Sequence, residues 1–323
     1  MKIIYMSESI DAVPKVYAHY DFGRVYTKAD LYANPEAFLD TEYIFSTWGM
    51  SELTADEIRK FLPNLKALFY AAGSVQRFAR PFLECGVRVF SAWMANAVPV
   101  AEYAASQILL ATKGFFHTCG ITSREDRVEN SHLSDQFPGN YDTTVGIIGA
   151  GAIGKLVIRR LKESRLNVLV FDPFLPQETA DALGVTLTGL DDLFRRSQVV
   201  SNHLANNPQP PGMLTAQHFA QLPHYGVFLN TGRGAQVVEA DLIATLQSRP
   251  DLIAILDVTF PEPPEENSPL YTLPNCILTP HIAGSKGNEF FRMADYMHET
   301  FEAYLCGNPV PYEVTTEMLK TMA

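Results

Sequence analysis

A glycine-rich turn between an apolar segment and a helical pattern restricts the fold of this chain more than any other feature. The segment TVGIIG ends at Gly149, and Gly151 and Gly154 complete the spacing G-x-G-x-x-G. Apolar residues then recur at helical spacing, at Ile153, Leu156, Val157 and Leu161. The turn therefore predicts a buried strand joined directly to an amphipathic helix, which is the repeating unit of parallel sheets.

The same turn is suited to a dinucleotide. Gly149 permits the tight turn, Gly151 lets the backbone approach a pyrophosphate, and Gly154 lets helix and strand pack closely. The helix N-terminus offers free N–H groups to the phosphates. The next strand candidate ends at Asp172, whose carboxylate can accept hydrogen bonds from ribose hydroxyls and would repel a 2′-phosphate. We therefore expect NAD rather than NADP, with a turn aspartate before Pro173 as the structural alternative.

A second phosphate-binding motif also matches this turn, but the chain lacks the hydroxyl that this motif requires. Gly149–Lys155 also fits the spacing G-x-x-x-x-G-K of loops that bind nucleoside triphosphates. That motif needs a serine or threonine hydroxyl for magnesium at the next position, where this chain has Leu156. The dinucleotide interpretation is therefore preferred.

Composition excludes several classes of protein. The formal net charge of −11 would repel phosphate backbones, so we expect no nucleic acid partner. No run of about 18 apolar residues occurs, so we expect no membrane span. The 4 scattered cysteines lack the close pairing of a zinc site or a redox dithiol, and they suit the reducing cytoplasm. No clustered ligands indicate a metal.

Strand-like and helix-like segments alternate along the chain, which predicts an α/β fold with parallel sheets. A helical segment at 100–113 joins the two halves, residues 118–142 look irregular, and 288–306 has the spacing of an amphipathic helix. The strand candidates are 2–6, 43–47, 65–70 and 87–90 in the first half, and 145–149, 168–172, 199–204, 227–230, 253–257 and 277–279 in the second.

Three motifs follow strand candidates of the second half, where open parallel sheets place ligands. The motifs are NTGRG (230–234), DVTFPEP (257–263) and TPHIAG (279–284). Reduction of a keto acid by a nicotinamide cofactor needs a cation for the carboxylate, an acid for the developing alkoxide, and a group that keeps this acid charged. Arg233 offers a bidentate fork, His281 exchanges a proton near neutral pH, and Glu262 can stabilise the charged imidazole. Asp257 ends a strand and is placed to accept from the nicotinamide amide.

Each of these residues also has a structural interpretation. His281 follows a proline and can be an ordinary loop histidine, and Glu262 lies in an acidic loop where a solvated carboxylate is the simpler explanation. Arg233, between two glycines, is hard to explain as a core or helix-face residue. The ordered succession of the three motifs favours one shared catalytic site.

The order of glycine turn, acid, N-x-x-R-G, D-V-x-x-x-E-P and P-H resembles the D-isomer-specific 2-hydroxyacid dehydrogenase family over nearly the whole chain. The resemblance implies hydride transfer between NAD and a small 2-hydroxy or 2-keto acid, with Arg233, Glu262 and His281 as catalytic residues. It also implies a homodimer. Besides the glycines, the cofactor-contacting positions that it implies are Ala152, Ile153, Asp172, Thr231, Gly232 and Asp257.

Two segments depart from the pattern of that family. The substrate loop, commonly G-A-G-x-D, reads AAGSVQ at 71–76. Backbone N–H groups around Gly73 and Ser74 are still expected to bind the substrate carboxylate, together with Arg233. After His203, the usual proline and threonine-rich turn is replaced by LANNPQP. The departure at Ser74 and Val75 is expected to alter the substrate pocket, whereas the departure after His203 concerns the shape of that loop and not the phosphate site.

The expected architecture has a flavodoxin-like substrate domain of residues 1–98 plus 289–323, with an inserted Rossmann domain of residues 99–288 that binds NAD. Closure of a hinge between the two would exclude water from the substrate. A nucleotide-sensing corepressor and an enzyme that acts on formate or phosphite stay open as alternative functions. The sequence does not distinguish glyoxylate, hydroxypyruvate, a sugar-derived acid and a branched keto acid as substrates.

Overall fold

The computed structural model describes residues 1–204 and 212–320, so most of the LANNPQP segment lies outside the described residues. The chain forms two compact units, Met1–Ala97 with Ser285–Ala323 as the first and Val98–Gly284 as the second. Each unit has its own parallel or mostly parallel sheet with helices on both faces. The predicted α/β class is therefore confirmed.

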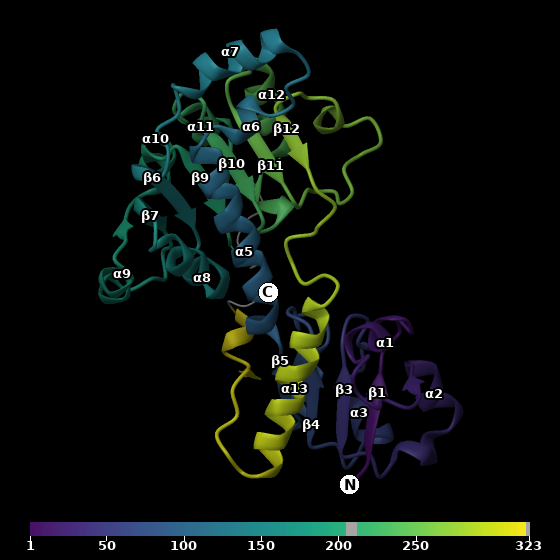
Figure 1. Ribbon diagram of the computed structural model, residues 1–323. Helices are drawn as coiled ribbons and strands as arrows, with labels where there is room; N and C mark the ends of the chain where they lie inside the picture. The colour runs from purple at the N-terminus through teal and green to yellow at the C-terminus, as the bar shows by residue number, and fades with distance from the viewer. Residues whose placement is uncertain (205–211, 321–323) are drawn as a thin grey trace. The chain divides into compact units, whose positions relative to one another are not determined.

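The first unit is built on a single sheet. Its elements, drawn in Figure 1, are β1 (Ile3–Met6), α1 (Ala12–Val16), β2 (Val25–Tyr26), α2 (Lys28–Ala33), η1 (Pro35–Phe38), β3 (Tyr43–Ser46), α3 (Ala55–Phe61), β4 (Ala67–Tyr70), α4 (Ala79–Glu84), β5 (Arg88–Ser91), α13 (Glu289–Leu305), β13 (Glu313–Val314) and η4 (Met318–Lys320). The strand order in the described residues is β13-β5-β4-β3-β1-β2, and every pair is parallel except β13 with β5. The order β2-β1-β3-β4-β5 is flavodoxin-like, as predicted.

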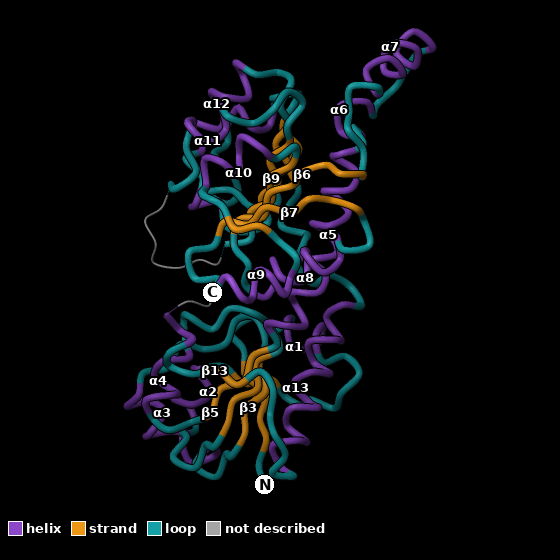
Figure 2. Tube along the Cα trace, turned by 90° about the vertical axis from the view of Figure 1, so that its left-hand side faces the viewer, coloured by secondary structure: helices purple, strands orange, loops and turns teal. Residues whose placement is uncertain are grey.

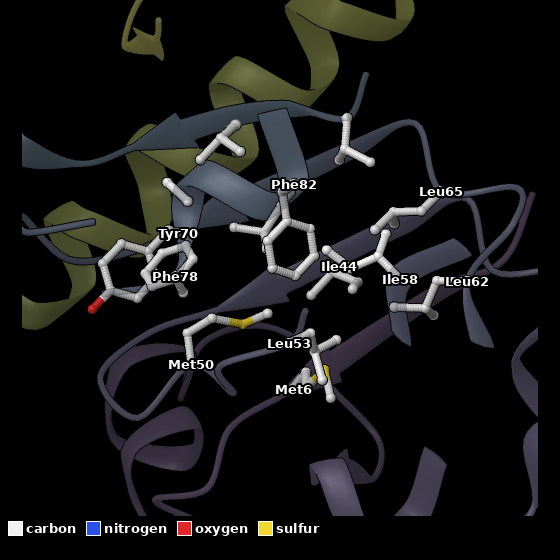
Figure 3. Close-up of a cluster of buried hydrophobic side chains, with 14 of the residues drawn as sticks. Met6, Ile44, Met50, Leu53, Ile58, Leu62, Leu65, Tyr70, Phe78 and Phe82 are labelled. Atoms are coloured by element: carbon white, nitrogen blue, oxygen red, sulfur yellow. The ribbon is translucent and has the colours of Figure 1, made fainter. Parts of the chain in front are cut away.

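Alternation along the strands decides which face of this sheet each residue covers. On β4, Leu68 and Tyr70 join the apolar cluster under α3 and α4, whereas Phe69 joins the cluster under α1 and α13. Figure 2 shows these two pairs of helices on opposite sides of the strands. Figure 3 shows the first cluster, in which Ile44 and Phe82 lie among other buried apolar side chains.

The second unit contains a parallel sheet of Rossmann order. Its elements are α5 (Trp93–Thr112, which begins in the first unit), α6 (Phe115–Thr118), α7 (Arg124–Ser134), β6 (Tyr141–Ile148), α8 (Ala152–Leu161), β7 (Arg165–Phe171), α9 (Gln177–Leu183), β8 (Thr186–Leu187), α10 (Leu190–Arg196), β9 (Val199–Asn202), α11 (Ala216–Ala220), β10 (Val227–Asn230), η2 (Gly234–Gln236), α12 (Glu239–Ser248), β11 (Ile253–Leu256), η3 (Pro269–Tyr271) and β12 (Cys276–Leu278). Within the described residues the order is β12-β11-β10-β9-β6-β7-β8. Helices α5, α8 and α9 cover one face, and α10, α11 and α12 cover the other.

The expectation that residues 118–142 are irregular is wrong, because α7 occupies eleven of them. Ser123 Oγ accepts from Asp126 N, and the Asp126 carboxylate accepts from Ser123 N, so a capping box starts this helix. The helix has no buried residue, and Figure 2 shows it extending away from the sheet of its unit. Across the described parts of the chain, no helix has the length and apolar character needed to cross a membrane.

Helix α13 contacts the first sheet through an aromatic cluster that contains a histidine. The His298 ring stacks on Tyr20 at 3.7 Å between centroids and on Phe45 at 4.6 Å. Its Nε2 lies 3.4 Å from the Tyr5 hydroxyl. Burial lowers the pKa of His298 to about 4, and the nearby Asp295 carboxylate only partly opposes this effect. The ring is therefore neutral in the folded protein at neutral pH.

We predict that His298→Phe makes the protein more resistant to acid. The folded-state pKa of His298 lies below the ordinary value of 6.5. The unfolded chain therefore binds a proton first, and stability is lost as pH falls from 6.5 towards 4. The phenylalanine variant lacks this penalty, which amounts to roughly 1–2 kcal/mol near pH 4.5 for a partly solvated ring. Thermal unfolding at pH 7 and pH 4.5 checks this, and an equal loss in Tm for both proteins contradicts it.

Candidate functional site

The three glycines between β6 and α8 each meet a different steric demand. Gly149 has φ 85°, and a Cβ there would lie 3.1 Å from the His203 carbonyl carbon. A Cβ on Gly154 would lie 2.0 Å from Gly149 O, so helix and turn pack too closely for any side chain. A Cβ on Gly151 would meet nothing within 4 Å, which leaves open space at the helix start. The turn is therefore tightly packed at Gly149 and Gly154, whereas its backbone is accessible at Gly151.

Asp172 follows β7 directly and fixes the glycine-rich turn. Its Oδ2 accepts from Ala150 N at 2.8 Å, and its Oδ1 accepts from Phe174 N at 2.9 Å. Each carboxylate oxygen keeps a further lone pair, so hydrogen bonds to ribose hydroxyls stay feasible. The turn interpretation and the cofactor interpretation of Asp172 are therefore compatible.

A buried histidine, His203, lies beside this turn in one of the predicted strand segments. His203 Nε2 is 2.8 Å from Ser201 Oγ, and Nδ1 is 3.1 Å from Thr231 Oγ1. Burial lowers the pKa of His203 to about 3, so the ring is neutral and offers one donor and one acceptor. The imidazole thereby orients the Thr231 hydroxyl. The neighbouring Gly232 N donates to Asn230 Oδ1 at 3.1 Å, so its N–H is used within the loop.

Arg233 follows β10 and is mostly buried. Its Nη1 donates to Gly232 O at 2.7 Å, and no ion pair of this guanidinium appears among the described residues. Burial lowers the pKa of Arg233, while the negative charge of Glu262 raises it. A Cβ on Gly234 would lie 2.0 Å from the Thr259 carbonyl carbon, so only glycine lets the Arg233 loop approach the loop that carries Glu262.

Glu262 and His281 form a hydrogen-bonded pair. His281 Nδ1 lies 2.7 Å from Glu262 Oε1, and the two side chains are 52% and 42% exposed. The contact occupies Nδ1, and among the described residues no partner of Nε2 occurs, so Nε2 is the nitrogen that can transfer a proton. His281 has φ 53°, a left-handed backbone conformation that costs energy for a residue other than glycine.

Asp257 supports the segment that carries His281. Its Oδ1 accepts from Thr279 Oγ1 at 2.6 Å and from Ile282 N at 2.8 Å, and its Oδ2 accepts from Ala283 N at 2.9 Å. The side chain is buried, so these three donors compensate its loss of water. A contact of Asp257 with the nicotinamide amide stays a prediction.

Two of the three residues expected to bind the substrate carboxylate, Gly73 and Ser74, lie in the first unit, in the loop after β4. Gly73 is half-buried and Ser74 is exposed. Asn96 Oδ1 accepts from Ser285 N at 3.0 Å, and its Nδ2 lies 3.7 Å from the position of a Cβ on Gly73. Asn96 was not predicted as part of this loop, because it lies more than twenty residues along the chain inside a helix.

Comparison with known proteins identifies the family. Residues 109–283 match the family described as D-isomer specific 2-hydroxyacid dehydrogenase, NAD binding domain, and this match covers more than half of the chain. The chain belongs to the D-isomer-specific 2-hydroxyacid dehydrogenase family. The predicted resemblance and the nicotinamide cofactor are therefore confirmed.

Relatives in this dehydrogenase family differ in their substrates. The D-3-phosphoglycerate dehydrogenase of Mycobacterium tuberculosis is 31% identical over 226 residues, which cover 70% of this chain and 42% of that protein. The glycerate dehydrogenase of Methylorubrum extorquens is 32% identical over 169 residues, 52% of this chain and 51% of that one. This chain therefore spans about half or less of their lengths. The holo form of D-mandelate dehydrogenase from Rhodotorula graminis shares the fold, with a TM-score of 0.76, 20% identity and 98% of both chains covered.

The residues of the glycine turn fit the cofactor of this dehydrogenase family. Helix α8 begins at Ala152, and its first intrahelical bond is donated by Lys155 N to Gly151 O. The N–H groups of Ala152, Ile153 and Gly154 therefore have no intrahelical acceptor, and the open space at Gly151 adjoins them. These donors and the positive end of the helix dipole would hold the pyrophosphate. No cluster of potential metal ligands occurs in the described ranges.

We predict that Asp257→Asn destabilises the second unit. The new amide would oppose the Ala283 N–H with a donor in a buried site, which costs about 1–3 kcal/mol. The variant Thr279→Val removes one donor and leaves the carboxylate intact, so its loss should be smaller. Urea unfolding of both variants beside the wild type checks this. Equal losses in the free energy of unfolding would contradict the prediction, because replacing the carboxylate would then cost no more than removing one of its donors.

Proposed function

We propose that the chain is an NAD-dependent dehydrogenase that interconverts a small D-2-hydroxy acid and the corresponding 2-keto acid. One observation carries the proposal: the Glu262–His281 hydrogen bond lies at the same sheet edge as Arg233, a mostly buried cation without a described carboxylate partner. An unpaired buried guanidinium is costly unless an anion joins it. A substrate carboxylate is such an anion.

The side chains divide the chemistry of reduction between them. When bound at the glycine turn, a nicotinamide cofactor would supply the hydride for the keto carbon. Arg233 binds the substrate carboxylate and polarises the keto oxygen. His281 donates the proton from Nε2 to that oxygen, which yields the hydroxyl of the product, while Glu262 stabilises the imidazolium before transfer through Nδ1. Oxidation of the hydroxy acid follows the same steps in reverse.

We propose NAD rather than NADP as the preferred cofactor. Asp172 places a negative charge where a 2′-phosphate would lie, and its lone pairs are available to ribose hydroxyls. The following residues, Pro173 to Glu178, contain no lysine or arginine that would neutralise a phosphate. NADPH should therefore bind less tightly than NADH.

We predict that the purified chain oxidises NADH with at least one 2-keto acid of a panel. The panel includes glyoxylate, pyruvate, branched keto acids and the keto acids that correspond to glycerate, 3-phosphoglycerate and mandelate, which the names of the relatives suggest. Loss of a general acid lowers kcat about 10²–10⁴-fold, so His281→Ala should lose turnover and keep NADH binding. Arg233→Ala should lose about 10²–10³-fold in kcat/KM because the carboxylate loses its cation.

The chain offers matched controls for both variants. His224 Nδ1 lies 2.9 Å from Asp251 Oδ2, so His224→Ala breaks a second histidine–carboxylate pair in the same unit without touching the site. Arg195 is an exposed arginine paired with Asp192, and Arg195→Ala serves the same purpose. If NADH binds and no keto acid is reduced, the result contradicts the dehydrogenase proposal and supports the alternative of a nucleotide sensor that binds a protein partner. If formate or phosphite is the only substrate that turns over, the result supports the second alternative, an enzyme that acts on formate or phosphite.

We also propose that a second copy of the chain covers α7. An isolated helix of eleven residues is barely stable in water, yet α7 has no buried residue in its own unit. Val128 is 52% exposed on α7, and Ile121 just before it is 43% exposed. A symmetric dimer that packs these residues would supply the missing contacts.

We predict a dimer in solution that Val128→Glu weakens. Light scattering after size-exclusion chromatography should give twice the mass of one chain for the wild type and a shift towards one chain for the variant. Glu129→Gln, a neighbouring exposed substitution, should leave the mass unchanged. A wild-type protein with the mass of one chain would contradict the proposal.

A further inference from the structure

A buried serine lies beneath the loop expected to bind the substrate carboxylate. Ser91 ends β5 in the first unit and has no exposed surface. Its Oγ lies 2.8 Å from Ala72 O and 2.7 Å from Gly73 O. One hydroxyl proton is thus shared between two successive carbonyl groups of the loop after β4. No feature of the sequence marked Ser91 as part of a site.

The two hydrogen bonds determine where the loop directs its N–H groups. In a trans peptide the C=O and N–H of one unit point in opposite directions. The Ala72 carbonyl shares its peptide unit with Gly73 N, and the Gly73 carbonyl shares its unit with Ser74 N. Both peptide bonds are trans. With both carbonyls directed at Ser91, the N–H groups of Gly73 and Ser74 are directed to the opposite side of the loop.

These two N–H groups are available to a ligand. The preceding N–H groups are occupied, since Ala71 N donates to Ser46 O and Ala72 N donates to Tyr70 O. For Gly73 N and Ser74 N, no acceptor occurs among the described residues. Ser74 is exposed, so the pair borders solvent. Adjacent backbone N–H groups on one side of a loop form an anion-binding concavity, and a carboxylate has one oxygen for each.

We propose that Ser91 is a positioning residue, which holds the Gly73 and Ser74 N–H groups in the orientation that binds the substrate carboxylate. The inference rests on the proposed function and names how the first unit recognises the acid. Without the hydroxyl, either carbonyl gains by turning towards water, and Gly73 permits the rotation because it has no Cβ. That rotation would turn an N–H group away from the ligand.

The test compares Ser91→Ala with Ser46→Ala. Ser46 ends β3, on the other side of β4, and is equally buried. Its hydroxyl donates to Met6 O at 2.5 Å and contacts neither the Ala72 nor the Gly73 carbonyl. For the keto acid identified by the panel, Ser91→Ala should raise KM about ten-fold, the effect of one lost hydrogen bond to a charged group. The KM for NADH should stay within about two-fold. Ser46→Ala should lower Tm by a similar amount and leave both constants unchanged.

A second readout does not depend on turnover. Oxalate, an unreactive dicarboxylate, is titrated calorimetrically into the full chain with NADH present, and Ser91→Ala should weaken its binding about ten-fold. Ser91→Cys keeps a weaker donor and should give an intermediate value, which also serves if the alanine variant does not fold. If the wild type binds oxalate without reducing any keto acid, the proposed function fails while the role of Ser91 is still measured.

Three results would overturn the role of Ser91. The first is an equal KM for the keto acid in Ser91→Ala and Ser46→Ala. The second is oxalate binding by Ser91→Ala or Ser91→Cys at wild-type strength. The third is a wild-type protein that neither binds oxalate nor reduces a keto acid, which would remove the carboxylate site together with the proposed function.

Discussion

The alignment of parallel strand ends is the constraint on which the catalytic chemistry depends. In the second unit, Ile148 pairs with Asn202, Asn202 with Asn230, and Asn230 with Leu256, so β6, β9, β10 and β11 end in register. The glycine turn, the Arg233 loop and the Asp257 loop all leave the sheet from this edge. Segments more than a hundred residues apart are thereby brought together by backbone hydrogen bonds alone. The side chains then need only short loops to meet, which keeps their positions precise.

In each unit, buried polar residues near the strand ends hold the loops in shape. Asp257 binds two N–H groups and a hydroxyl near His281, neutral His203 joins two hydroxyls, and Ser91 binds two carbonyls in the first unit. A buried polar group is costly unless it is paired, so each loop is stabilised only in the conformation that completes the pairing. This explains how His281 keeps a left-handed backbone and how Gly73 keeps one of several accessible conformations.

The sequence predicts those features that depend on local pattern. The longer strands, the glycine turn and the flavodoxin-like and Rossmann sheets were predicted correctly. They depend on the alternation of apolar residues, on helical spacing and on the position of glycines, which are all visible in residues close together in the sequence. The strands β2, β8 and β13 were missed because two residues show no periodicity. Helix α7 was missed although Ser123 and Asp126 have the spacing of a capping box, since its two apolar residues, Val128 and Leu133, do not show helical spacing. The role of Ser91 was not recognisable because its partners, the Ala72 and Gly73 carbonyl groups, lie in the loop after another strand.

The roles proposed for these residues limit what the family can reveal about the substrate. A carboxylate and a carbonyl are common to every 2-keto acid, so the proposed roles of Arg233 and His281, and that of the Gly73 and Ser74 N–H groups, concern only this shared part. The rest of the substrate must be selected by side chains outside these networks. Ser74 is a candidate for such a position, because its N–H belongs to the proposed anion site while its exposed side chain makes none of the hydrogen bonds that shape the loop. Substitution there is therefore expected to alter the proposed pocket without disturbing the hydrogen bonds of Ser91.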